Sequence, residues 1–133
     1  MPSQLTQSKL FQQAPTVEQY FSTFNQGDFR ATSQLFTEAG QLLPPFEDSI
    51  LGQVAIHSYL ESEASGMKAI PKEVTVESLA ESRQRVIVKG SVKASLFTVN
   101  AAWLFEIDPQ GRIEQVEVKL LASLQELLTF RKD

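Results

Sequence analysis

Residues 98–107 read Thr-Val-Asn-Ala-Ala-Trp-Leu-Phe-Glu-Ile and hold the only tryptophan of the 133-residue chain. Successive side chains of a β-strand point to opposite faces, and every odd position here is apolar: Val99, Ala101, Trp103, Phe105 and Ile107. The even positions mix polar and apolar residues, which is typical of a partly solvated face. The stretch therefore predicts a central strand. Because the small Ala101 lies beside the large Trp103, we expect a hollow there, the floor of a pocket.

The period-two pattern continues on both sides of this strand. Further strands are predicted over residues 73–80, 84–97 and 112–121. Asp108-Pro-Gln-Gly111 predicts the turn before the last of them. No Gly or Pro separates 84–97 from 98–107, so we expect a tight bend near residues 96–99. Long consecutive strands that bend sharply indicate a curved, mostly antiparallel sheet.

The first half of the chain has helical spacing instead. A helix is expected from Pro15, with Thr16 as its cap and an apolar stripe of Val17, Tyr20, Phe21 and Phe24. A second helix is expected from Asp28 to a stop at Gly40, and a third over residues 53–64. Two prolines within residues 41–46 predict a short edge segment that leads into a loop.

Helices followed by strands indicate an α+β fold, with three N-terminal helices on a curved sheet that forms a cone. A capping box at Ser123 predicts a short last helix over residues 124–131. Residues 1–14 are rich in Gln and Ser and are expected to form a flexible arm, although Leu10 and Phe11 could instead dock it. Residues 15–133 are expected to form one domain.

Composition excludes several classes of function. The chain has no cysteine and one histidine, His57, so no thiolate chemistry and no multi-histidine metal site is expected. The net charge is -4, and no run of Lys or Arg exceeds Arg131-Lys132, so nucleic acid is not an expected partner. No apolar run approaches the ~20 residues of a membrane span, and no signal peptide is recognised. We expect a soluble, cytoplasmic protein.

Several short segments, in this order and spacing, resemble one known family. They are Tyr20-Phe21, Asp28-Phe-Arg-Ala-Thr32, Leu35-Phe-Thr-Glu38, Pro44-Pro-Phe46, Asn100-x-Ala-Trp-x-Phe105, Leu120-Leu-Ala-Ser123 and Glu126-Leu-Leu-x-Phe130. From Val17 to Arg131 the chain is similar to the nuclear-transport-factor-2-like superfamily. Within it, the chain resembles the C-terminal domain of the cyanobacterial orange carotenoid protein and that domain's free-standing homologues. Leu96 departs from the family pattern, which has a tryptophan there.

The resemblance implies a ketocarotenoid, of the canthaxanthin or echinenone type, held without a covalent bond in an apolar cone. It also implies that Tyr20 and Trp103 hydrogen-bond the keto oxygen of the pigment. Independently of the resemblance, tyrosine and tryptophan supply the donors that a buried carbonyl needs. The expected walls of the site are Phe24, Met67, Ile70, Phe97, Val99, Val118 and Leu120. The competing interpretation is that all of these are ordinary core residues.

The resemblance further implies a homodimeric carrier with a role in photoprotection and singlet-oxygen quenching. Such a carrier would exchange pigment with a helical carotenoid protein, docked through Glu63, or with a membrane. Its expected place is the cytoplasm near thylakoid membranes. We expect the homodimer to form through the outer sheet face, which carries Val86, Val88, Ala102 or Leu104 according to register.

Two other classes of function stay open. The same cone hosts small-molecule enzymes of the SnoaL and ketosteroid-isomerase type, which need an acid or base inside the apolar cone. Candidates are His57, Glu38, Glu106 and Glu117. Glu106 and Glu117 alternate with apolar residues, so they are expected to face away from the core. The third class is a dimeric interaction module without a ligand.

Overall fold

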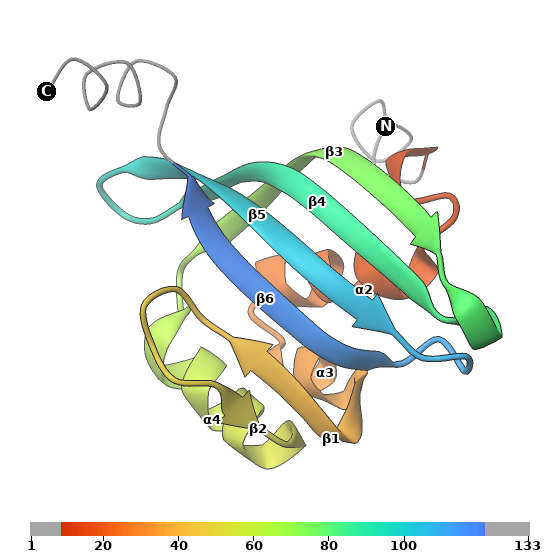
Figure 1. Cartoon of the computed structure of the whole chain (residues 1–133). Coiled ribbons are helices and arrows are strands. Elements are labelled where there is room, and N and C mark those ends of the chain that lie inside the picture. Colours follow the sequence, from red (N-terminus) through yellow and green to blue (C-terminus); the bar gives the residue numbers. More distant parts are fainter. Residues whose placement is uncertain (1–8, 122–133) are drawn as a thin grey trace, which may run out of the picture.

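A computed structural model of the chain describes residues 9–121. Three helices, α2 (Pro15–Asn25), α3 (Phe29–Gln34) and α4 (Gln53–Glu63), lie on one face of a curved six-stranded sheet (Figure 1). The strands are β1 (Phe36–Leu43), β2 (Ile50–Leu51), β3 (Lys68–Ser78), β4 (Gln84–Lys93), β5 (Thr98–Ile107) and β6 (Ile113–Leu121). Their order is β2-β1-β6-β5-β4-β3, and every pair is antiparallel except β1 with β6. The predicted α+β cone is confirmed; its last helix lies outside the described residues.

Strand β5 lies inside the sheet, between β4 and β6, and its odd residues face the helices. Trp103 is paired with Val88 of β4 and Val118 of β6. The next inward row is Phe105 with Val86 and Val116, all of them 0% exposed. Val86 and Val88 therefore belong to the core and not to the outer face, where they would have supported a dimer. The outer face carries Ile87, Ala102 and Leu104, because alternation turns these side chains away from the helices.

The segment after α3 differs from the predicted helix. The helix ends at Gln34, and Phe36 already begins β1, which pairs in parallel with β6. Gly40 is a residue of β1 rather than a helix stop. A Cβ at Gly40 would lie 2.9 Å from that of Phe36, so the irregular stretch of strand between them requires glycine. Residues 41–46 were expected to be an edge segment, but β1 is not at the edge of the sheet, because the two-residue β2 pairs with its outer side.

Strand β3 begins at Lys68, before the predicted start at residue 73, and passes through Pro71. The strand is at the edge of the sheet and its register with β4 shifts between Pro71 and Glu73, the two conditions under which a strand accepts proline. The backbone of β3 approaches β4 closely at Gly90. A Cβ built on Gly90 would lie 2.0 Å from the carbonyl oxygen of Ile70.

We expect Gly90→Ala to lower the free energy of unfolding by roughly 2–4 kcal/mol, because the added methyl forces β3 away from β4. Urea unfolding measures the change. Lys89→Ala is the matched control, since Lys89 is the exposed neighbour on the same strand. Equal unfolding midpoints for Gly90→Ala and the unmodified chain would show that β3 does not approach β4 in this way.

Helix α2 is tied to the sheet at both ends. Thr16 at its start does not cap it as predicted; the cap position is Ala14, and the Thr16 hydroxyl instead donates to the Gly111 carbonyl oxygen at 2.6 Å. At the other end, the Asn25 side chain bonds both backbone polar groups of Ala69, at 2.9 and 2.7 Å. These contacts hold the middle of the helix over the strands. The predicted cap of α3, Asp28, does accept from the Ala31 amide.

The part of the N-terminal arm that the structure describes, residues 9–14, packs on the domain through Phe11. Phe11 is 1% exposed and stacks on Phe21 of α2, with ring centroids 5.6 Å apart. Residues 9–14 therefore dock through Phe11, which is the alternative considered for this arm. The free energy gained by burying the aromatic ring outweighs the effect of the polar residues around it. Residues 1–8 lie outside the described residues. None of the described helices has the length and apolar character needed to cross a membrane.

Candidate ligand-binding site

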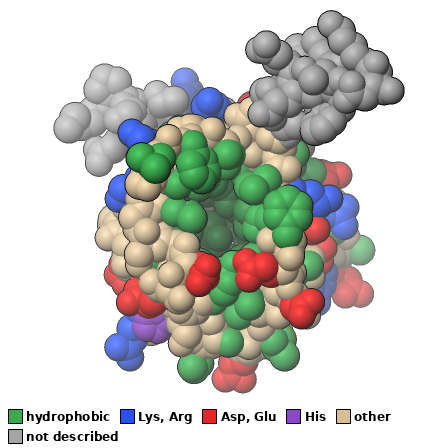
Figure 2. Space-filling model, turned by 90° about the vertical axis from the view of Figure 1, so that its left-hand side faces the viewer, with side chains coloured by type: hydrophobic (Ala, Val, Ile, Leu, Met, Phe, Trp, Pro, Cys, Tyr) green, Lys and Arg blue, Asp and Glu red, His purple; other side chains and the backbone are tan. Residues whose placement is uncertain are grey.

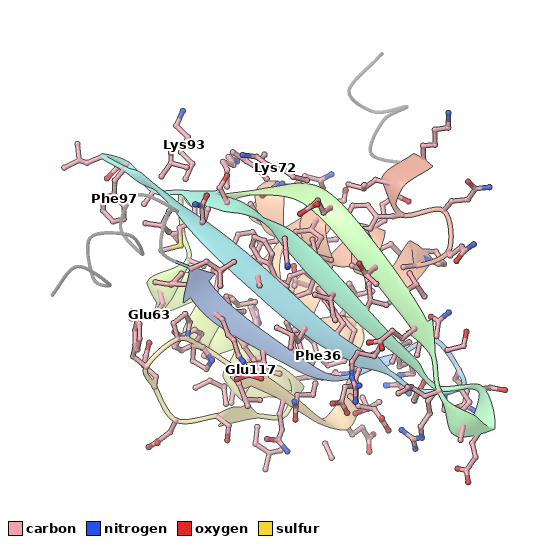
Figure 3. All side chains as sticks on the ribbon, turned by 45° about the horizontal axis from the view of Figure 1, so that its top comes forward. Phe36, Glu63, Lys72, Lys93, Phe97 and Glu117 are labelled. Carbon is pink, nitrogen blue, oxygen red and sulfur yellow. The ribbon has the colours of Figure 1, made fainter. Side chains whose placement is uncertain are left out.

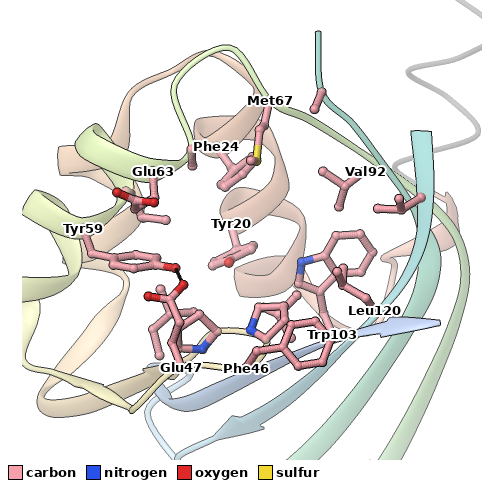
Figure 4. A pocket seen from close by; sticks show the side chains of 18 of the residues that line it. Tyr20, Phe24, Phe46, Glu47, Tyr59, Glu63, Met67, Val92, Trp103 and Leu120 are labelled. Atoms are coloured by element: carbon pink, nitrogen blue, oxygen red, sulfur yellow. Dashed lines mark hydrogen bonds between the residues drawn. The ribbon is translucent and has the colours of Figure 1, made fainter. Parts of the chain in front are cut away.

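A cavity of about 350 Å³ opens at one end of the cone, between the helices and the concave face of the sheet. Figure 2 shows it as a hollow ringed by hydrophobic side chains, and Figure 4 shows its interior. Its walls come from α2, α4, the β1–β2 loop and strands β4, β5 and β6. The volume is within the range of ~300–1,000 Å³ that is usual for small-molecule sites.

Tyr20 projects into the cavity from the middle of α2 (Figure 4). Its ring is fixed edge-on against Phe105 at 5.1 Å and Phe21 at 5.3 Å, and lies roughly parallel to Phe24 at 6.2 Å. The side chain is 2% exposed, and burial raises the pKa of its hydroxyl, which therefore stays protonated. No other described residue hydrogen-bonds this hydroxyl. Since every fully buried polar side-chain atom in the described part has a partner, the hydroxyl must face the cavity.

Trp103 is the second donor of the cavity. It is 3% exposed and packs edge-to-face on Phe21 at 4.9 Å, so its orientation is fixed from behind. On the inner face of the sheet, the pair Gly90 and Ala101 separates the Trp103 row from the Val92–Val99 row. These two small residues leave the hollow that was predicted beside the tryptophan. No hydrogen bond joins the indole N–H to another described residue, and since no fully buried polar side-chain atom of the described part lacks a partner, the N–H faces the cavity as the Tyr20 hydroxyl does.

The two donors, neither of which bonds another described residue, determine what the cavity can bind. When a ligand displaces water from the cavity, a donor left without an acceptor costs ~1–3 kcal/mol, so a ligand with an acceptor at this place is favoured. The remaining wall is almost entirely apolar. The arrangement fits an apolar molecule that ends in a carbonyl group, which accepts from Tyr20 and Trp103 while its carbon frame fills the rest.

The mouth of the cavity carries two acidic side chains. The Tyr59 hydroxyl on α4 donates to Glu47 Oε2 in the β1–β2 loop at 2.8 Å. Burial, with the added effect of the Glu47 and Glu63 carboxylates, raises the pKa of Tyr59. Glu63 follows Tyr59 by one helical turn and lines the same mouth (Figure 4). Among the described residues that line the cavity, none is basic.

Apolar side chains surround the mouth on the solvent side. Phe46 is 93% exposed and Phe97, labelled in Figure 3, is 62% exposed, although both line the cavity. Leu96, next to Phe97 in the β4–β5 hairpin, is 91% exposed. The hairpin is closed by the Ala94 amide donating to the Phe97 carbonyl at 2.9 Å, in the place where a tight bend was expected. A cluster of exposed apolar groups of this kind usually marks a site of contact.

The structure brings together nearly all of the predicted site residues. The cavity is lined by Tyr20, Phe24, Met67, Phe97, Val99, Trp103, Val118 and Leu120, and Glu63 lies at its mouth. Ile70 is the exception. It is 39% exposed, because the neighbouring Ala69 takes the inward position on β3 and alternation turns Ile70 outward.

About half of the residues that line the cavity were not predicted from the sequence. The missed residues are Leu42, Pro44, Pro45, Phe46, Glu47, Tyr59, Leu60, Ala64, Val92 and Ala94. Two signals could have found some of them. Tyr59 and Glu63, like Leu60 and Ala64, are four residues apart on one helix face, and Val92 shares the inward phase of β4 with Val86 and Val88. No local signal places the β1–β2 loop over the mouth.

The candidate acid–base residues of an enzyme do not meet in the cavity. Glu106 and Glu117 lie on the outer face of the sheet, as predicted, because the adjacent Phe105 and Val116 take the inward positions. Glu38 and His57 do not line the cavity either. The described residues contain no group of three or more His, Asp or Glu side chains placed to hold a metal ion.

The fold and this pocket define an α+β cone with an internal binding site. The sequence description of the nuclear transport factor 2 (NTF2) domain matches residues 13–116, and the chain belongs to this family. A putative polyketide cyclase from Xanthomonas campestris has the same fold, with 17% identity and a TM-score of 0.61 over 86% of this chain and 93% of its own. At that identity the likeness concerns the fold alone.

More specific similarity is to the C-terminal domain of orange carotenoid proteins. The orange carotenoid-binding protein of Synechocystis sp. is 34% identical over 121 residues, which is 88% of this chain and 38% of that protein. The structure of the orange carotenoid protein of Anabaena (Nostoc) sp. PCC 7120 binding canthaxanthin matches with 35% identity and a TM-score of 0.79, over 87% of this chain and 38% of that one. The chain thus spans 38% of the length of the curated relatives that it matches.

Proposed function

We propose that this chain binds a ketocarotenoid of the canthaxanthin or echinenone type in the cavity, without a covalent bond, and carries it. One observation supports this most: the hydrogen-bond donors of two buried side chains, Tyr20 and Trp103, face an apolar cavity and bond no other described residue. The keto oxygen of the terminal ring accepts from both. Burial of the ring adds about 25 cal/mol for each Å² of apolar surface removed from water. The two donors also polarise the conjugated chain, which shifts its absorption to the red.

The cavity is suited to a carrier rather than to catalysis. Its interior holds no carboxylate or imidazole from the described residues, since Glu47 and Glu63 are at the mouth and His57 is elsewhere. Among the described residues, Tyr20 is the only titratable group in the interior, and its raised pKa keeps it a donor rather than a base. The relative named for carotenoid binding is 34% identical to this chain over the 121 aligned residues, whereas the cyclase is 17% identical.

The apolar mouth suggests how pigment enters and leaves. A carotenoid is much longer than the cavity, so its polyene extends past the exposed Phe46 and Phe97. We propose that these side chains make transient contact with a membrane or with a helical carotenoid protein, with Glu63 at the docking edge. The homodimer would use the outer sheet face, where Ile87, Ala102 and Leu104 lie. In this role the protein serves photoprotection and singlet-oxygen quenching in the cytoplasm, near thylakoid membranes.

Expression in a ketocarotenoid-producing host tests the proposal. The protein is expected to purify coloured, with one pigment per chain or per dimer and an absorption band to the red of the free pigment. Size-exclusion chromatography of the same sample gives the oligomeric state. A folded but colourless protein would exclude the carrier function.

A further inference from the structure

We propose that Glu47 and Glu63 make the pocket selective for neutral, carbonyl-bearing polyenes and exclude the corresponding carboxylic acids. This inference rests on the proposed function and names the class of ligand more narrowly. The two glutamates are the only charged side chains among the described residues that line the cavity, and both lie at its mouth (Figure 4). Both border the opening, so a ligand that enters the cavity passes beside them.

The position of Glu47 is fixed by a contact within the mouth. Its carboxylate accepts from the Tyr59 hydroxyl at 2.8 Å, which joins the β1–β2 loop to α4. Glu63 extends from the same helix one turn later. The carboxylates are therefore held on two elements that border the opening, rather than dispersed over the surface.

Among the described residues, no basic side chain lines the pocket to offset this charge. Lys93 lies at the end of β4, but its neighbour Val92 takes the inward position, so Lys93 faces away from the cavity (Figure 3). The ammonium of Lys68, next to the lining residue Met67, donates to the Asn25 carbonyl at 2.5 Å. A ligand carboxylate would find neutral donors in the cavity but no counter-ion from the described lining residues.

The interior donors alone do not make this selection. A carboxylate accepts hydrogen bonds more strongly than a ketone, so the free hydroxyl of Tyr20, which is 2% exposed, would by itself favour an acid. Against this, a carboxylate loses hydration worth several kcal/mol in an apolar cavity. Repulsion by the carboxylates of Glu47 and Glu63 adds to the cost of this lost hydration. Substitution of the two glutamates changes only this repulsion.

Screening by salt sets the range of the effect. The Debye length is ~8–10 Å at physiological salt, so the repulsion acts on a carboxylate that enters the cavity of about 350 Å³ or lies in its mouth. An acid that enters with its carboxylate first, the orientation in which that group could reach Tyr20 and Trp103, therefore meets repulsion. With the effective dielectric of a protein surface, each glutamate is expected to weaken acid binding about three- to tenfold at low salt.

The test compares two probes with one carbon skeleton, β-apo-8′-carotenal and β-apo-8′-carotenoic acid, at pH 8. Trp103 is the only tryptophan of the chain and lines the cavity, so quenching of its fluorescence reports binding at this site. The variants are Glu47→Gln, Glu63→Gln and the double substitution; glutamine keeps an acceptor for Tyr59. Glu117→Gln is the matched control, because it makes the same charge change on the outer face (Figure 3).

We expect the unmodified chain to bind the aldehyde at least about tenfold more tightly than the acid in 10 mM salt, and this preference to shrink in 500 mM salt. The double variant is expected to bind the acid about tenfold or more tightly than the unmodified chain does, with unchanged affinity for the aldehyde. Equal binding of both probes by the unmodified chain, or a double variant that behaves like Glu117→Gln, overturns this inference and leaves the proposed function standing. A folded chain that binds neither probe overturns both.

Discussion

Tyr20→Phe and Trp103→Phe are each expected to weaken ketocarotenoid binding about 5- to 30-fold, which corresponds to the ~1–2 kcal/mol of one hydrogen bond to a buried carbonyl. The absorption band of the bound pigment is expected to move to the blue in each variant, since one donor no longer polarises the keto group. The double variant is expected to lose more than about 100-fold, because the carbonyl is then buried without a partner.

Each substitution removes a polar group and keeps an aromatic ring in the core. Tyr20 packs on Phe24 and Phe105 through its ring, so Tyr20→Phe preserves those contacts and the fold is expected to stay intact. Tyr59→Phe is the matched control, because it removes a tyrosine hydroxyl that bonds Glu47 at the mouth. If Tyr59→Phe moves the absorption band as far as Tyr20→Phe does, the keto oxygen does not lie in the interior of the cavity.

Val92→Phe is expected to abolish pigment binding, with affinity reduced at least about 100-fold. Val92 points inward from β4 and lines the cavity, so a phenyl ring there occupies the space of the terminal ring of the ligand. The ring enters an existing cavity, so the free energy of unfolding is expected to change by less than about 1 kcal/mol, below the usual cost of overpacking.

Titration with canthaxanthin measures the loss for Val92→Phe, and urea unfolding shows whether the fold is kept. Val54→Phe is the control, since it makes the same change at a residue of α4 that is 82% exposed and does not line the cavity. If both Val92→Phe and Val54→Phe bind the pigment with normal affinity, the ligand lies outside this cavity.

The sequence was informative where a local pattern decides the structure. Residues 98–107 form one strand with the predicted boundaries, and Asp108-Pro-Gln-Gly111 forms the predicted turn, closed by the Gly111 amide on the Asp108 carbonyl at 2.9 Å. Strict alternation and turn chemistry are properties of neighbouring residues. Tyr20 and Trp103 were predicted to meet, in part through resemblance, because neither helix α2 nor strand β5 alone shows that they share a cavity.

The failures concern contacts between distant segments. Phe36 to Gly40 was predicted to end a helix, but parallel pairing with β6, more than seventy residues away, makes this stretch a strand. Ile70 has the right chemistry for the wall but lies on the wrong side of β3. Glu47 and Tyr59 at the mouth depend on how a loop meets a helix, and no periodicity encodes that contact.

The most direct test of the account compares canthaxanthin with β-carotene, which has the same skeleton without keto oxygens. Both are titrated into the purified chain, and quenching of Trp103 is measured together with the visible spectrum of the bound pigment. We expect canthaxanthin to bind at least about tenfold more tightly than β-carotene, because only canthaxanthin has a carbonyl that satisfies the donors of Tyr20 and Trp103. For the same reason, only the absorption band of canthaxanthin is expected to move to the red on binding. Equal affinities, with no spectral difference beyond that of the free pigments, would contradict the account.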